Sequence, residues 1–223
     1  MKVEKFKKDI EGSFTDLKKG KMKKKVKFNY EDKFTMPMWT CRNVLYLISQ
    51  AVKNLGEGES YLNYGVWQGA TLLIPAYFNK DKRCDGVDNF LSSHWGGSNE
   101  DRVRGSIAGH DLKNVNLYVK HYRDFLSAYP LPASSNPKYG VAFMDGDHTY
   151  ELTLDALNLV VPCMAEKSVI ILDDISEEEG VKKAMKEWLP ESGYKMLWEL
   201  PLVDKEKKIW WSGISVLQRG MKE

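Results

Sequence analysis

The chain has 223 residues, of which 43% are hydrophobic and 12% aromatic, and its formal net charge is +2. This composition excludes an intrinsically disordered chain, and the length suffices for one domain with a sizeable core. No apolar run approaches the roughly 18–20 residues that span a bilayer, so a membrane span is not expected.

The first 40 residues are predicted to form a lysine-rich arm appended to the domain that follows. Residues 1–27 hold 11 lysines and 4 acidic residues, a local net charge of +7, which leaves −5 for the rest of the chain. The densest stretch, 18–27, suggests contact with nucleic acid or an anionic membrane. It contains no arginine and no interleaved base-stacking aromatic residue, so a solvated arm is favoured and nucleic-acid binding is not expected.

From residue 41 onward, helical and strand patterns alternate. Helices are predicted at 41–55, 69–78, 99–110, 150–164 and 177–189, and strands at 60–66, 83–90, 115–122, 139–145 and 168–174. Residues 194–200 and 209–217 flank a turn-like segment and suggest an antiparallel hairpin. The alternation predicts one α/β domain at 41–223, with a mainly parallel sheet and helices on both faces.

The three cysteines, Cys41, Cys84 and Cys163, show no short spacing. This argues against a thiolate metal site and against a disulfide framework. No apolar run follows the first lysines, as it would in a secretory signal. We therefore expect reduced thiols and a cytoplasmic protein.

In such a sheet, ligands bind beyond the carboxyl ends of the strands. The first predicted strand runs into Gly65 and Gly69, which allow the backbone to approach a ligand and open the next helix. Their GxxxG spacing differs from the GxGxxG of dinucleotide folds, which favours a cofactor without a pyrophosphate. The alternative is that these glycines serve packing alone.

The second predicted strand ends at Asp88. A carboxylate at this place accepts hydrogen bonds from ribose hydroxyls, and it selects a nucleoside rather than one particular cofactor. The alternative is that Asp88 and Asn89 only start a turn.

The fourth and fifth predicted strands end in carboxylates, Asp145 and the pair Asp173-Asp174. Neighbouring strands would bring these acids together, and such a group is stabilised by protonation or by a cation. Oxygen ligands suit Mg²⁺. The alternative is that Asp147 or Thr149 caps the next helix and that Asp174 starts a turn. We expect capping from Asp147, but it leaves Asp145 unexplained.

His148 follows these acids in the chain. Its unperturbed pKa lies near neutrality, so it is a candidate general base. A hydrogen-bonded structural histidine near a helix start is the other interpretation, and the sequence leaves both open.

These residues resemble class I S-adenosylmethionine-dependent methyltransferases, in the DGDHxYE subfamily that is related to macrocin-type sugar O-methyltransferases and cephalosporin hydroxylases. The resemblance is carried by LNYGVWQGAT, GVDNF followed by WGGSNED, FMDGDHTYELTLDAL and VIILDDISEEEGVKKAMKEW. It implies a Rossmann-like sheet of seven strands, with the last two strands supplied by the hairpin.

The resemblance also implies a site. Gly65 and Gly69 would lie against the methionine end of the cofactor, with Asp88 on its ribose. The acids Asp145, Asp173 and Asp174 would hold Mg²⁺ near the acceptor hydroxyl, where the metal lowers that hydroxyl's pKa.

Two departures from the family pattern bear on the cofactor. Asn63 stands where the family usually has an acid, and its amide still offers hydrogen bonds. Lys120, His121 and Tyr122 stand where the family often has Gly-Asp-Ser, so His121 and Tyr122 are the candidates for the adenine end.

The resulting prediction is an O-methyltransferase for a small hydroxylated acceptor, with sugar-containing acceptors included, assisted by Mg²⁺ and using Asp145 and His148 in catalysis. The alternative is a non-catalytic module that binds a nucleoside or a partner on the same scaffold. An iron-dependent hydroxylase is disfavoured, since no two-histidine-one-carboxylate set is visible.

Loop 91–101, with His94 and Trp95, is expected to line the acceptor pocket. The sequence leaves open whether the protein forms a homo-oligomer.

Overall fold

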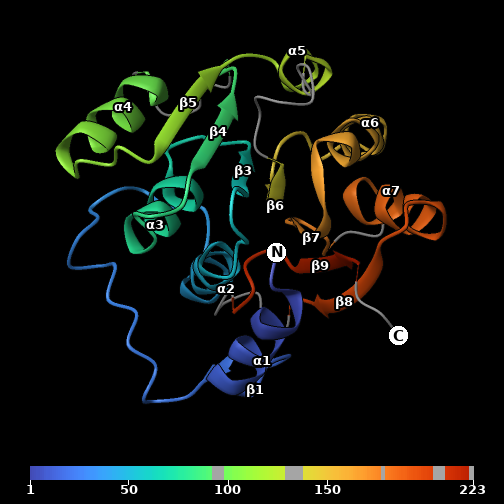
Figure 1. Cartoon of the computed structure of the whole chain (residues 1–223), viewed down its shortest axis with the longest axis horizontal. Coiled ribbons are helices and arrows are strands. Elements are labelled where there is room, and N and C mark those ends of the chain that lie inside the picture. Colours follow the sequence, from blue (N-terminus) through green and yellow to red (C-terminus); the bar gives the residue numbers. More distant parts are fainter. Residues whose placement is uncertain (92–97, 129–137, 177–178, 203–208, 221–223) are drawn as a thin grey trace.

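The computed structural model of the chain describes residues 1–91, 98–128, 138–176, 179–202 and 209–220 (Figure 1). Its helices are α1 (Val3–Ser13), α2 (Arg42–Lys53), α3 (Ala70–Phe78), α4 (Asn99–Gly109), α5 (Tyr122–Ser127), α6 (Tyr150–Val160) and α7 (Val181–Trp188), with 3-10 turns η1 (Val161–Cys163) and η2 (Leu189–Glu191). Its strands are β1 (Phe14–Asp16), β2 (Lys21–Met22), β3 (Ser60–Tyr64), β4 (Cys84–Asp88), β5 (Val115–Val119), β6 (Tyr139–Met144), β7 (Met164–Leu172), β8 (Lys195–Leu200) and β9 (Ile214–Arg219).

Seven of the strands form one sheet in the order β5-β4-β3-β6-β7-β9-β8. The strands β5, β4, β3, β6 and β7 run parallel, whereas β9 is antiparallel to both β7 and β8. This arrangement confirms the predicted fold class, including the C-terminal hairpin. The chain leaves β3 toward β4 on one side and returns to β6 on the other, so β3 and β6 flank the switch point where open α/β sheets bind ligands.

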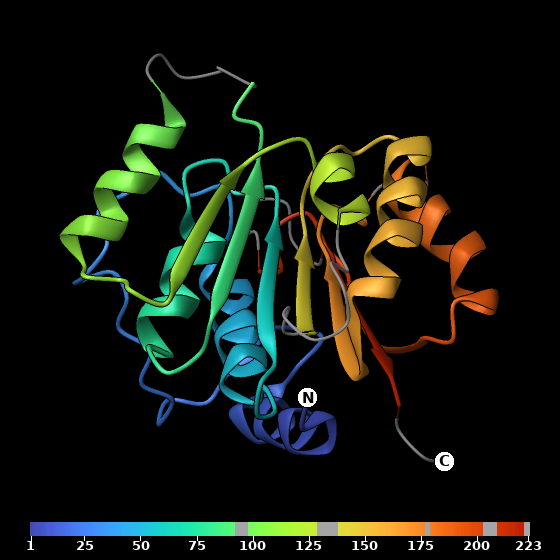
Figure 2. The same ribbon diagram turned by 45° about the horizontal axis from the view of Figure 1, so that its top comes forward.

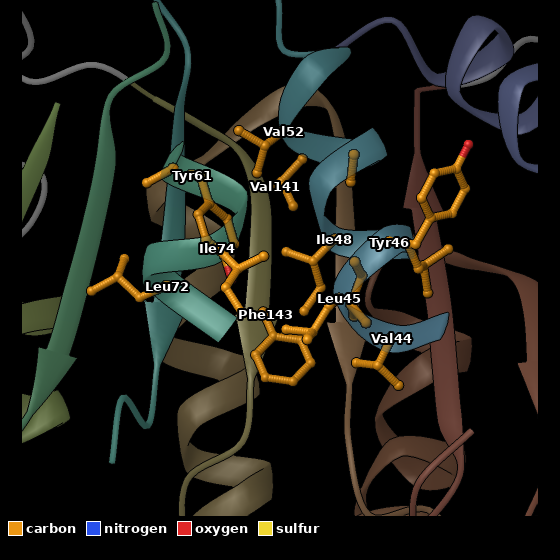
Figure 3. Close-up of a cluster of buried hydrophobic side chains, with 14 of the residues drawn as sticks. Val44, Leu45, Tyr46, Ile48, Val52, Tyr61, Leu72, Ile74, Val141 and Phe143 are labelled. Carbon is orange, nitrogen blue, oxygen red and sulfur yellow. The ribbon is translucent and has the colours of Figure 1, made fainter. Parts of the chain in front are cut away.

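The two faces of the sheet are covered by different helices, with α2 and α3 on one face and α5, α6 and α7 on the other (Figures 1 and 2). Alternate residues of β6 enter the two cores: Val141 and Phe143 pack with α2, and Ala142 and Met144 pack with α6. Figure 3 shows Leu45 and Ile48 of α2 beside Val141 and Phe143. Burial on both faces explains why β6 is an almost continuous apolar run.

The N-terminal arm packs against the α2 side of the sheet instead of extending into solvent. Its aromatic and aliphatic residues Phe6, Ile10, Phe14, Phe28 and Phe34 are at most 4% exposed and belong to the same core as α2. The arm therefore combines a buried apolar side with an exposed lysine-rich side.

Several predicted bounds shift in the structure: the strand predicted at 209–217, for example, is β9 at Ile214–Arg219. Two of the shifts have a clear local cause. The helix expected to reach Met164 stops at Val160, because Pro162 has no N–H to continue the helical ladder, and Met164 instead begins β7. The strand expected to reach Tyr122 stops at Val119, because His121 accepts a hydrogen bond from the Arg123 N–H and starts the unpredicted helix α5.

In the part of the chain that the structure describes, no helix has both the length and the apolar character needed to cross a bilayer.

Candidate active site

A cavity of about 360 Å³ opens at the carboxyl ends of the parallel strands. Its walls come from the turn after β3, the ends of β4 and β5, the loop between β6 and α6, and Asp174 after β7. The N-terminal arm adds Trp39 and Thr40, and the segment before β9 adds Trp211. Residues from both ends of the chain therefore meet at the switch point of the sheet.

Gly65 brings the turn after β3 against the end of β6. Its φ is +82°, and a Cβ at this position would lie 1.8 Å from the carbonyl oxygen of Asp145. The Asp145 N–H in turn donates to the Tyr64 carbonyl at 2.9 Å. Gly65 lines the cavity, and it also makes the close contact between two backbone segments possible.

Gly69 and Asn63, two predicted cofactor residues, lie outside the cavity lining. Gly69 precedes α3 with φ +97°, and a Cβ there would meet the side chains of Leu73 and Val103. Asn63 is fully buried; its amide donates to the Gly65 carbonyl and accepts from the Thr71 hydroxyl, both at 3.0 Å. Both residues therefore shape the turn, and their direct contact with a cofactor stays a prediction.

Asp88 lines the cavity and also organises the turn. One carboxylate oxygen accepts the N–H groups of Val66 and Trp67 at 2.8 Å each, and the other accepts the Phe90 N–H at 2.7 Å. A carboxylate accepts about four hydrogen bonds, so one position remains for a ligand. The two interpretations of Asp88, turn former and ligand binder, are compatible.

Three aromatic rings follow one another along the cavity. The Tyr64 and Tyr122 ring centroids are 4.9 Å apart, and those of Tyr122 and His121 are 4.7 Å apart. The Tyr122 hydroxyl donates to Asp155 at 2.7 Å, which ties the start of α5 to α6. The predicted residues His121 and Tyr122 do line the cavity, and Tyr64 joins them from β3.

Asp145, His148 and Asp174 form a compact group of donors. The Nε2 atom of His148 lies 3.0 Å from Asp174 Oδ2 and 3.5 Å from Asp145 Oδ1. The ligand atoms of all three residues lie within 4.8 Å of one another. Two carboxylates and an imidazole at this spacing can hold a metal ion, and we call this group the acid–histidine cluster.

Asp173 is not a member of the acid–histidine cluster, although its charge interacts with all three of its residues. It is only 2% exposed, and its carboxylate accepts the backbone N–H of Asp174 at 2.9 Å. Burial, together with the negative charges of Asp145 and Asp174, raises the pKa of Asp173 well above its usual range. The structure thus brings two members of the predicted metal trio to the cavity with His148, and it turns the third inward.

The charges within the cluster are strongly linked. Hydrogen bonds with Asp145 and Asp174 raise the pKa of His148 to about 10, so the imidazole is a cation at neutral pH. Burial by itself raises the pKa of Asp174, but the hydrogen bond and charge of His148 outweigh it, and the net pKa is lowered. A protonated imidazole accepts no proton, so His148 can act as a general base only after it loses this one.

The cap of α6 is Thr149, one of the two candidates, and not Asp147, from which capping was expected. The Thr149 hydroxyl accepts the Leu152 N–H at 3.4 Å, whereas Asp147 accepts the N–H of Thr149 at 2.9 Å, one step before the helix. Asp147 therefore forms a local turn that leads into the cap.

Among the cavity residues that the sequence did not indicate are Trp39, Thr40 and Trp211, which lie outside the predicted strand ends. Trp39 stacks on Trp67 with ring centroids 4.9 Å apart and an interplanar angle of 30°. The buried Thr40 hydroxyl has no hydrogen-bond partner within the described part of the chain. No local pattern marks these residues, because they reach the site only through tertiary packing.

His94 and Trp95, predicted to line the acceptor pocket, lie outside the described residues.

Comparisons with known proteins agree with this architecture. Residues 62–175, or 114 of the 223, match the family model described as a methyltransferase domain. None of the curated proteins matches the chain in sequence.

Several solved structures share the fold. An O-methyltransferase from Bacillus cereus in complex with SAH has a TM-score of 0.58 at 14% identity, covering 86% of this chain and 95% of that one. TomG from Streptomyces achromogenes, an O-methyltransferase of tomaymycin synthesis in complex with SAM, has a TM-score of 0.57 at 12% identity, with coverages of 86% and 94%. The O-methyltransferase NovP has a TM-score of 0.58 at 19% identity and 79% coverage of both chains.

At 12–19% identity, the solved structures support the fold alone. The family match covers half of the chain and therefore assigns the family. The matched residues run from β3 to the segment after β7 and so include the glycine turn, Asp88 and the acid–histidine cluster. The chain therefore belongs to the methyltransferase-domain family and is a class I S-adenosylmethionine-dependent methyltransferase.

Proposed function

We propose that this chain is an O-methyltransferase that binds S-adenosylmethionine in the cavity and methylates a hydroxyl of a small-molecule acceptor with the help of a divalent cation. One observation carries the proposal: a single cavity joins the glycine turn and Asp88 to the acid–histidine cluster. A nucleoside-binding half and an acidic half in one cavity are what a cofactor and a hydroxyl acceptor need when they react side by side.

The residues present fit the cofactor. The volume of about 360 Å³ lies in the range of roughly 300–1,000 Å³ that is usual for ligand pockets. The free acceptor position of Asp88 suits a ribose hydroxyl, and the rings of Tyr64, Tyr122 and His121 offer flat faces for adenine. The cofactor supplies an electrophilic methyl group on a positively charged sulfonium, and the nearby carboxylates complement that charge.

The acid–histidine cluster fits a divalent cation. Carboxylate oxygens suit Mg²⁺ and Mn²⁺, and an imidazole nitrogen adds affinity for transition ions. The proton on His148 now lies between the two carboxylates, so a cation and this proton compete for the same donors. A bound cation would lower the pKa of an acceptor hydroxyl.

The protein's own residues would mainly position the reactants. With the cation held by Asp145, Asp174 and His148, the proton of the acceptor hydroxyl would leave to water. Without a cation, one of the two carboxylates would accept a hydrogen bond from that hydroxyl, and neutral His148 would take up its proton at Nε2. Trp39, Trp67 and Trp211 restrict the access of water. Holding two reactants in the reactive geometry accounts for several kcal/mol of a displacement barrier, up to about 7–11 kcal/mol in well-oriented systems.

A second candidate is a module on the methyltransferase scaffold that binds a nucleoside without transferring a methyl group. The departures at Asn63 and at Lys120-His121-Tyr122 motivate it, because these residues stand where the family pattern has others around the cofactor. Transfer to any hydroxylated acceptor excludes this candidate.

The test is calorimetry with S-adenosylmethionine and S-adenosylhomocysteine, with and without MnCl₂, followed by transfer assays on an acceptor panel. We expect both nucleosides to bind more tightly than about 1 mM, or −4.1 kcal/mol. Asp145→Asn should leave this binding intact and abolish metal-dependent transfer, whereas Asp81→Asn, an exposed acid outside the cavity lining, should change neither. Absence of binding by both nucleosides would refute the proposal.

A further inference from the structure

The N-terminal arm carries a basic segment that the proposed function does not use. Residues 18–27 contain seven lysines and no acidic residue. Lys18, Lys19 and Lys21 are exposed and stand within four residues, at the turn between β1 and β2. We call residues 17–21 the lysine turn.

The lysine turn is held firmly in place. The Leu17 carbonyl accepts the indole N–H of Trp210 at 3.0 Å, and the Gly20 carbonyl accepts the Asn43 amide at 3.1 Å. Gly20 has φ +58°, and a Cβ there would lie 2.2 Å from the side chain of Ile209. Asn43 also donates to the Ile209 carbonyl at 3.0 Å. The turn is therefore fixed against both residues 41–43 and residues 209–210.

These same two segments continue directly into the cavity wall. Thr40 precedes Cys41, whose thiol donates to the Ile209 carbonyl, and Trp211 follows Trp210. Ser212 then hydrogen-bonds Asp174 of the acid–histidine cluster. The lysine turn thus packs on the two segments that lead into the acidic half of the cavity, where the acceptor would lie.

The lysine charges are largely uncompensated. Lys19 lies 3.8 Å from Asp16, a pair with both side chains exposed and thus of little energetic weight. Lys18 and Lys21 form no ion pair with any residue in the described ranges. Core packing holds these like charges together, and an anion beside them would relieve their repulsion.

We propose that the lysine turn binds a phosphate or diphosphate group carried by the methyl acceptor, while the acceptor's hydroxyl lies at the acid–histidine cluster. Lysine ammonium groups are compact charges that bind phosphate oxygens, and they need no planar partner. The absence of arginine from the arm disfavours a nucleic-acid partner. This inference rests on the proposed function, because it assigns a chemical class to that enzyme's acceptor.

The binding experiment uses the full chain with tripolyphosphate as probe, measured by calorimetry at low salt. The triple variant Lys18→Gln, Lys19→Gln, Lys21→Gln should bind the probe about tenfold more weakly, since charge-assisted hydrogen bonds are lost. The control, Lys8→Gln, Lys53→Gln, Lys113→Gln, removes the same charge from exposed positions elsewhere and should bind like wild type. Equally weakened tripolyphosphate binding in both variants would overturn the inference, because binding would then depend only on the overall charge of the protein.

The link to the acceptor is tested with pairs of hydroxylated compounds that differ by one phosphate ester. We expect the phosphorylated member to be the better acceptor, and the lysine-turn variant to raise its KM about tenfold with kcat little changed. Equal use of both members by the wild type would overturn the assignment. Binding of S-adenosylhomocysteine, measured in the same samples, separates the two failures. If the wild type does not bind it, the proposed function fails. If the wild type binds it but shows no preference for the phosphorylated acceptor, only this inference fails.

Discussion

Gly65 is a residue whose side chain, a single hydrogen, decides the geometry of the site. Alanine at this position would have to adopt φ +82° and place its Cβ 1.8 Å from the Asp145 carbonyl oxygen. The left-handed conformation alone costs roughly 1–2 kcal/mol, and the clash adds to it by pushing the turn away from β6. We expect Gly65→Ala to lower the free energy of unfolding by more than about 2 kcal/mol in urea titrations and to abolish S-adenosylhomocysteine binding.

Gly105 is the matched control for this prediction. It lies within α4, and a Cβ there would meet nothing within 4 Å. Gly105→Ala should stabilise the protein by about 0.5–1 kcal/mol, because alanine is the better helix former. Equal effects at the two glycines would show that the turn has no special steric requirement.

His148 provides a prediction about pH. Its pKa in the folded protein is about 10, above the ordinary 6.5, because Asp145 and Asp174 hydrogen-bond its charged form. The resulting stability is complete below pH 6.5 and is lost as the pH rises through about 10. In chelator-treated samples, the stability advantage of wild type over His148→Gln should therefore shrink between pH 6.5 and 10.

The size of this effect is limited by solvent. The His148 side chain is 57% exposed, so its contribution is at most about 1 kcal/mol. Denaturant unfolding of both proteins at several pH values measures it. A difference that grows with pH would show that the acids do not hold a charged His148.

At the scale of elements, the start of α5 depends on α6. Asp155 of α6 accepts hydrogen bonds from the Tyr122 hydroxyl and from Arg123 Nε, both at 2.7 Å. Tyr122 carries the aromatic row along the cavity. We therefore expect Asp155→Ala to weaken S-adenosylhomocysteine binding several-fold by calorimetry, with a loss of about 1 kcal/mol in stability.

A double-mutant cycle of Tyr122→Phe with Asp155→Ala tests whether this effect passes through the ring. The coupling should be about 0.5 kcal/mol or more, because the two groups are in direct contact. Additive effects would show that Asp155 does not act through the Tyr122 hydroxyl.

For the whole molecule, the arm should behave as part of the core. Phe6 of α1 is fully buried, and its ring lies 5.6 Å from that of Trp198 in β8. Phe6→Ala should cost about 3–5 kcal/mol in a single cooperative unfolding transition. Lys8→Ala, at an exposed position of the same helix, should cost less than about 0.5 kcal/mol. A small effect at Phe6, or a separate early transition, would mean that the arm is only loosely attached.

From residue 41 onward, local sequence determined most of the elements and their layers, with the short helix α5 as an exception. A continuous apolar run such as β6 predicts a strand that is buried on both faces. The alternation of helices and strands then restricts the connections to those of a doubly wound sheet. Because neighbouring parallel strands end at one edge, the meeting of Asp145 with Asp174 also followed from the chain order.

Only the tertiary structure decided which side chains enter the cavity. Successive residues at a strand end point to opposite sides, so Asp173 turned inward while Asp174, with φ +57°, faced the site. His148 joined the acids, and Trp39 and Trp211 arrived from segments far apart in the chain. No periodicity encodes such contacts, because they depend on how separately formed elements pack together.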